Sequence, residues 1–160
     1  MSRHALVTDA ELVSTIEIRA AVGAFGHIYP DSAAKPIPAD LIPEWTTYLV
    51  HPDTLALICT DPVDAGCLCI IADSAVPHGR RLARLYVQPE HWGLGVAQGL
   101  YMEALVHECQ LGTKALNLWV LEKNQRARSM YESWGWTLIP NTSRTPHHPD
   151  VVEVMYELIV

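Results

Sequence analysis

Hydrophobic residues near the start of the chain recur with a helical period. Leu12, Ile16 and Ala20 follow one another at four-residue spacing, which places them on one face of a helix. The pattern predicts a helix over Asp9–Ala24. Three prolines then fall within residues 26–38, so this stretch is predicted to be a loop.

The next hydrophobic segments are shorter. Residues 41–49 favour a short helix, whereas residues 54–60 and 66–72 are brief apolar runs typical of strands. The segment 61–66 between these runs contains Asp, Pro and Gly, which favour turns. An antiparallel hairpin is therefore predicted.

A strand, a turn and a helix are predicted in the middle of the chain. Within residues 80–87, Leu82, Arg84 and Tyr86 alternate with Ala83, Leu85 and Val87, as the two faces of a strand do. A glycine-bearing turn follows. The apolar positions of residues 95–111 then fit one face of a helix, and Gly112 is well placed to end that helix. Residues 114–121 favour another strand.

The last third of the chain begins with a capped helix. Asn124 is a good N-cap, and Gly135 is placed to end the helix. Two final strands are predicted at 136–139 and 151–159. This order of elements is that of a mixed α/β fold, and a chain of 160 residues suits one domain over 1–160.

Composition adds the class of protein. Hydrophobic residues make up 49% of the chain and charged residues 18%, a balance typical of globular proteins. No run approaches the roughly 18 apolar residues of a membrane span, and no secretory signal precedes the first helix. We expect a cytoplasmic protein without membrane contact. The four cysteines lack the paired spacing of zinc ligands, so we expect free thiols and no metal.

Charge is distributed unevenly along the sequence. The net charge of −7 argues against a nucleic-acid partner. Residues 80–128 nevertheless hold seven basic and four acidic side chains, while both flanking segments are acidic. A cationic middle suits an anionic ligand and acidic flanks suit a cationic partner such as an amine, although an ordinary solvated surface explains the same pattern.

The glycine turn carries the most specific chemistry. Gly93 and Gly95 lie between a strand and a helix, where free N–H groups and the helix dipole favour a phosphate. A Walker loop requires a Gly-Lys pair, which the chain lacks. The dinucleotide fingerprint requires Gly or Ala where Gln98 stands, and an acidic residue where 115–118 are uncharged. Both nucleotide motifs are excluded.

The same segment resembles motif A of the GNAT superfamily of N-acetyltransferases, in which Gln/Arg-x-x-Gly-x-Gly/Ala marks a strand–turn–helix junction. The matching positions run from Trp92 to Ala97. The run 124–136, Asn-Gln-Arg-Ala-Arg-Ser-Met-Tyr-Glu-Ser-Trp-Gly-Trp, is similar to motif B of that family. The resemblance implies a central, largely antiparallel sheet that splays at an acetyl-CoA site and is flanked by helices.

The resemblance also implies which residues hold acetyl-CoA. The main chain of the central strand would bind the pantetheine and the thioester, and the glycine turn would bind the diphosphate. The second motif would make further contacts with the cofactor. One departure is that Trp92 replaces the polar Gln or Arg of the motif and cannot make the usual polar contact. Either cofactor binding is weaker, or Trp92 contributes packing against the cofactor. The implied cofactor-binding residues are Leu85, Tyr86, Val87, Trp92, Gly93, Leu94, Gly95, Val96, Ala97, Asn124 and Arg126. Arg126 and Arg128 can reach the adenosine phosphates, and ordinary solvated arginines are the equal alternative for both.

Catalysis is assigned to Tyr131 on the same resemblance. A phenol is protonated at neutral pH and can donate its proton to a leaving thiolate. Tyr131 also completes an apolar stripe with Ala127, Met130 and Trp134, so core packing is the alternative. No general base stands out among Glu44, Tyr86, His91 and Glu122, and the pair His147 and His148 is interpreted as surface.

The sequence therefore predicts an acyltransferase that moves an acetyl group from acetyl-CoA to a primary amine in a ternary complex. A catalytically silent acyl-CoA-binding module and transfer of a longer acyl group are the alternatives. The acceptor, a small molecule or a peptide, is expected near 26–38 and 41–49, where Tyr29, Trp45 and Tyr48 can stack or pack. A homodimer is left open.

Overall fold

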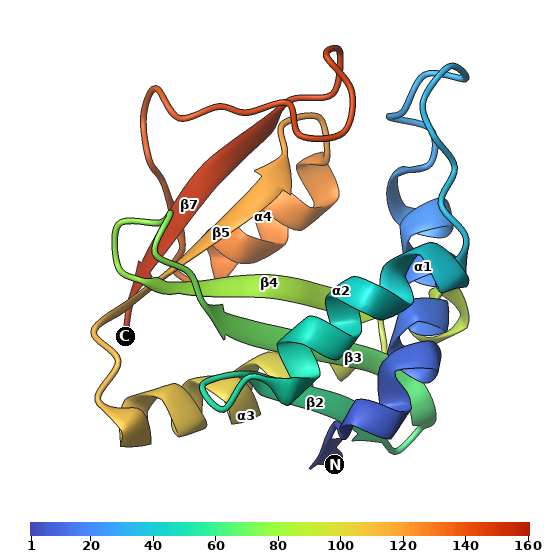
Figure 1. Ribbon diagram of the computed structural model, residues 1–160. Helices are drawn as coiled ribbons and strands as arrows, with labels where there is room; N and C mark the ends of the chain where they lie inside the picture. Colours follow the sequence, from blue (N-terminus) through green and yellow to red (C-terminus); the bar gives the residue numbers. More distant parts are fainter.

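The computed structural model describes all 160 residues and consists of one seven-stranded sheet with helices on both faces (Figure 1). The α-helices are α1 (Ala10–Phe25), α2 (Pro38–Val50), α3 (Val96–Leu111) and α4 (Gln125–Ser133), with short 3-10 turns η1 (Val7–Asp9) and η2 (Pro89–His91). The strands are β1 (Ser2–His4), β2 (Leu55–Thr60), β3 (Val63–Ala72), β4 (Arg80–Val87), β5 (Ala115–Leu121), β6 (Thr137–Leu138) and β7 (Glu153–Ile159). No helix is long and apolar enough to span a membrane.

The strands lie in the order β1-β2-β3-β4-β5-β7-β6, and every neighbouring pair except β4 and β5 is antiparallel. The two parallel strands are in register at a single point, Arg81 opposite Asn117, and separate beyond it. The predicted mixed sheet, largely antiparallel and splayed at its centre, is confirmed.

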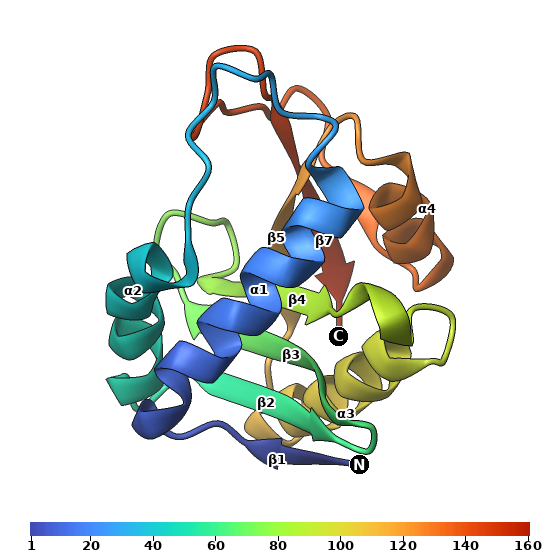
Figure 2. The ribbon, with the colours of Figure 1, turned by 90° about the vertical axis from the view of Figure 1, so that its right-hand side faces the viewer.

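Two hydrophobic clusters fill the space between the sheet and its helices. The larger cluster packs α3 and α4 against one face and includes residues from both sides of the splay, from Leu55 on β2 to Leu158 on β7. The smaller cluster packs α1 and α2 against β2, β3 and β4 only. Figure 2 shows α1 lying across these strands, with α3 behind the sheet. The two halves of the sheet are therefore joined by a core on one face alone.

Some predicted boundaries were wrong. The turn predicted over 61–66 is shorter, because β3 already begins at Val63, with Asp64 at a positive φ of 56°. Strand β1 was not predicted, since its three residues are polar and its pairing is supplied by β2. The strand predicted over 136–139 is reduced to Thr137–Leu138, and α2 begins at Pro38, three residues earlier than expected.

Candidate active site

Strand β4 carries main-chain groups that no neighbouring strand pairs. Its register against β3 steps from Cys69–Arg84 to Ile70–Leu82, so that Ala83 forms a bulge. The N–H of Gln88 donates to the carbonyl of Ala65 at 2.8 Å, so the main chain of Gln88 faces β3. Because main-chain groups alternate in direction along a strand, the N–H and C=O of Leu85 and Val87 point away from β3 and into the splay.

Tyr86, also predicted to bind with its main chain, has the opposite orientation. Its N–H and C=O face Cys67 on β3, and its ring belongs to the cluster under α1 and α2. Burial and the nearby Glu17 carboxylate raise the pKa of the Tyr86 phenol well above its ordinary value. This side chain is therefore neutral and turned away from the splay.

The turn after β4 ends at the N-terminus of α3. Gly93 and Gly95 both have a φ of +79°, which L side chains rarely adopt, and a Cβ at either position would meet no atom within 4 Å. The first donor inside the helix is the N–H of Gly99, which bonds to the carbonyl of Gly95. The N–H groups of Val96, Ala97 and Gln98 thus have no partner within the helix, beneath open space that a phosphate can enter.

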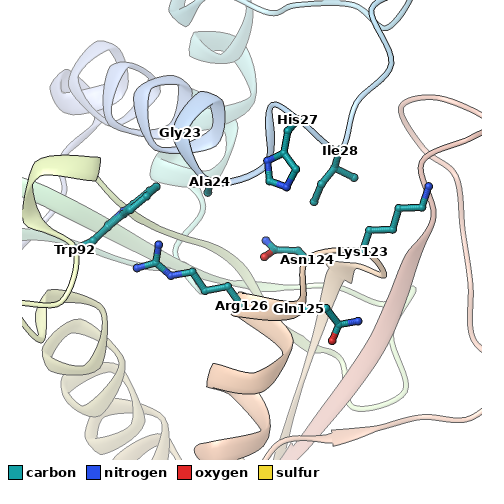
Figure 3. A pocket seen from close by; sticks show the side chains of 9 residues that line it. All are labelled: Gly23, Ala24, His27, Ile28, Trp92, Lys123, Asn124, Gln125 and Arg126. Carbon is teal, nitrogen blue, oxygen red and sulfur yellow. The ribbon is translucent and has the colours of Figure 1, made fainter.

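A cavity of about 370 Å³ opens beside this turn (Figure 3). It lies between the end of α1, the Trp92 side chain and the start of α4. The lining residues are Gly23, Ala24, His27, Ile28, Trp92, Lys123, Asn124, Gln125 and Arg126. None of them is a carboxylate, whereas Lys123 and Arg126 are cationic, so the cavity favours an anionic ligand.

Three of the residues predicted to bind the cofactor meet at this cavity. Trp92 donates its indole N–H to the carbonyl of Val87 at 2.7 Å, and the Arg126 guanidinium lies 4.4 Å from the centre of the same indole. Asn124 accepts a hydrogen bond from the N–H of Ala127 at 3.2 Å and so caps α4, as predicted. Arg128 is engaged elsewhere, since it donates to the Tyr156 hydroxyl and to the carbonyl of Glu122.

Tyr131 lies on α4 within the larger hydrophobic cluster. Its ring packs edge-on against Trp134 and Trp136, with centroids 6.0 and 5.9 Å away. Val96 belongs to the same cluster, and Leu85 and Val87 pack against it. Burial raises the pKa of the Tyr131 phenol above its ordinary value, so that the hydroxyl keeps its proton at neutral pH.

Residues 22–136, which include both glycine-bearing motifs, match the acetyltransferase (GNAT) family. The chain belongs to the GNAT acetyltransferase family. No curated protein sequence is significantly similar to this acetyltransferase.

Solved structures of other acetyltransferases share its fold. The PaiA N-acetyltransferase of Thermoplasma acidophilum, in complex with coenzyme A, is 17% identical with a TM-score of 0.75, over 100% of this chain and 98% of that one. The ribosomal-protein-alanine N-acetyltransferase of Brucella melitensis is 14% identical with a TM-score of 0.76, over 100% and 99%. The ribosomal-protein-S18-alanine N-acetyltransferase of Escherichia coli is 18% identical with a TM-score of 0.72, over 100% and 93%.

The candidate bases of this acetyltransferase are dispersed. Burial acts to raise the pKa of Glu44, but the Arg84 charge and a hydrogen bond from Tyr48 outweigh it and lower that pKa. Glu122 is exposed, and His91 ends the turn η2.

His148 lies near Ser32, with Nε2 and Oγ 3.4 Å apart, which brings the loops before α2 and before β7 together.

A buried charged network on the α1 side was missed at the sequence level. Glu17 accepts hydrogen bonds from the indole of Trp45 at 2.8 Å and from Arg84 Nε at 3.0 Å, and Arg84 also donates to Glu44 at 2.7 Å. Trp45 is therefore a packing residue. The signal was present, because Glu17 takes one of the six buried positions on α1, which are 10, 13, 14, 16, 17 and 20.

Proposed function

We propose that this acetyltransferase transfers the acetyl group of acetyl-CoA to a primary amine by direct attack in a ternary complex, as one catalytic domain. The observation that carries the proposal is the pair of residues Leu85 and Val87, whose N–H and C=O groups point into the splay next to the free N-terminus of α3. These two features suit the amide-rich pantetheine and the diphosphate of acetyl-CoA respectively.

In the reaction, the amine nitrogen attacks the thioester carbonyl carbon and forms a tetrahedral intermediate. The N–H of Val87 stabilises the oxyanion. The carbon–sulfur bond then breaks and the Tyr131 hydroxyl donates its proton to the departing thiolate. The ammonium proton leaves to water, and the tyrosinate takes a proton back from water before the next turnover. A neutral phenol at low accessibility is suited to this role, since it loses its proton only as negative charge develops on sulfur.

The test is acetyl transfer from radiolabelled acetyl-CoA to a panel of amino acids, polyamines and peptide N-termini. Tyr131→Phe should lower kcat by about 100-fold, within the range of general acid catalysis, and leave the acetyl-CoA affinity unchanged. Tyr101→Phe is the matched control, because Tyr101 belongs to the same hydrophobic cluster and its hydroxyl accepts only from the indole of Trp136. Full activity of Tyr131→Phe would remove the acid role.

A second candidate function is an acyl-CoA-binding module without turnover. Trp92 favours this second function, because its indole N–H donates to the Val87 carbonyl at 2.7 Å and so takes up one of the main-chain groups assigned to the substrate. Calorimetry that shows tight acetyl-CoA binding, together with no transfer to any amine in the panel, would support this second function over the first.

A further inference from the structure

Trp92 stands where the family motif has Gln or Arg, and its side chain is fixed on three sides. The indole N–H donates to the Val87 carbonyl at 2.7 Å. The far edge of the ring lies against α1, where a Cβ on Gly23 would meet Trp92 Cη2 at 3.2 Å. The Arg126 guanidinium lies over the remaining part of the ring, 4.4 Å from its centre. A single indole therefore connects β4, α1 and α4.

Arg126 is otherwise free. Its side chain is exposed and forms neither an ion pair nor a hydrogen bond with the protein, so its contact with Trp92 is the only one that orients it. The contact with the ring uses none of the N–H donors of the guanidinium in a hydrogen bond within the protein, so they are available to a ligand. Figure 3 shows the Arg126 side chain pointing toward Trp92, and Asn124 and His27 line the same cavity.

We infer that Trp92 is a positioning residue, which holds the Arg126 guanidinium at the mouth of the cavity so that it binds a phosphate group of the ligand. The charged contact that the motif normally places at position 92 is thus supplied from α4. This inference rests on the proposed function, because the phosphate belongs to acyl-CoA. Both the diphosphate and the 3′-phosphate of that ligand have the required chemistry.

The contacts give the sign of the expected effects. A charge-assisted hydrogen bond to phosphate contributes about 1.5–3 kcal/mol, which corresponds to roughly tenfold or more in affinity. Arg126→Gln should therefore weaken CoA binding by about tenfold. If Trp92 acts through Arg126, Trp92→Leu should weaken it by a similar factor, and the double variant should be no weaker than Arg126→Gln alone. Trp92→Phe keeps a ring face and should lie between.

The experiment measures the affinities of CoA, dephospho-CoA and S-acetylpantetheine by calorimetry at two salt concentrations. Trp92→Leu should weaken CoA binding and reduce its salt dependence, and it should leave S-acetylpantetheine binding unchanged. Retention of the effect with dephospho-CoA assigns Arg126 to the diphosphate, and its loss assigns Arg126 to the 3′-phosphate. Trp119→Leu is the matched control, because Trp119 is likewise stacked under an arginine, with Arg144 at 4.3 Å.

Three outcomes would overturn the inference. Tighter CoA binding by Trp92→Leu would identify Trp92 as a plug that competes with the ligand for Val87. Equal weakening for S-acetylpantetheine would show a general structural role. Additive effects in the double variant would show that Trp92 and Arg126 act separately. Failure of the unaltered protein to bind CoA would instead refute the proposed function, and the inference with it.

Discussion

The buried network of Glu17 and Arg84 allows a stability prediction with an internal control. Arg84 donates to two carboxylates, and their side chains differ in exposure: Glu17 is 9% exposed and Glu44 is 47% exposed. Removing each charge in turn, by Glu17→Gln and Glu44→Gln, therefore tests how burial of the carboxylate changes the strength of its ion pair with Arg84. Glu17→Ala additionally removes the acceptor of the Trp45 indole.

The magnitudes follow from what each variant leaves unpaired. Glu17→Gln keeps an acceptor for Trp45 but loses a buried charge-assisted hydrogen bond, which costs about 2 kcal/mol of unfolding free energy. Glu17→Ala also leaves the buried indole N–H unsatisfied, for a total of about 4 kcal/mol. Glu44→Gln weakens a solvent-screened pair and should cost less than about 1 kcal/mol.

Urea unfolding followed by far-UV circular dichroism checks these values, since the midpoint shifts while the slope stays constant if both states are unchanged. In a thermal scan, Glu17→Ala should lower the Tm by about 10 °C. Equal destabilisation by Glu17→Gln and Glu44→Gln would refute the reasoning, because burial would then not govern the strength of either pair. A cost below 1 kcal/mol for Glu17→Ala would refute it too.

Two further predictions concern α4 and the thiols. Asn124→Ala should destabilise the protein by about 1 kcal/mol through loss of the helix cap, whereas Asn124→Ser should restore most of it in the same urea titration. A thiol reagent should titrate one cysteine in the native protein and four in urea, because only Cys109 is exposed. Burial raises the pKa of Cys69 to about 12, so rapid reaction of a second native thiol would contradict the structure.

Elements with a local signal could be predicted from the sequence. The helices α1, α3 and α4 combine an apolar stripe with end signals close by in the chain, such as Asn124 and Gly112, and their positions are confirmed to within a residue or two. Strand β1 has no such signal. Its polar residues form a strand only because β2 offers an unpaired edge, so that long-range pairing decides their conformation.

The candidate site divides in the same way. Its glycine turn and capped helix are local motifs, so the sequence indicated their positions and their preference for a phosphate. The packing of Trp92 against Gly23 and under Arg126 joins residues about 70 and 34 positions away in the chain, and no local pattern encodes it. Glu17 was missed for another reason, since a carboxylate on a helix is usually solvated and only its place in the apolar stripe indicated burial.

The single register point between β4 and β5 affects how firmly the two halves of the sheet are held together. The smaller cluster binds β2, β3 and β4 to α1 and α2 and contains no residue of β5 or β7. On that face β4 and β5 are in register only at Arg81 and Asn117, whereas the larger cluster joins the two halves of the sheet on the opposite face. A ligand that lies between β4 and β5 like an extra strand can form main-chain hydrogen bonds to both halves of the sheet. Hydrogen exchange at the amides of Leu85 and Val87 should therefore slow more on ligand binding than exchange anywhere else in the sheet.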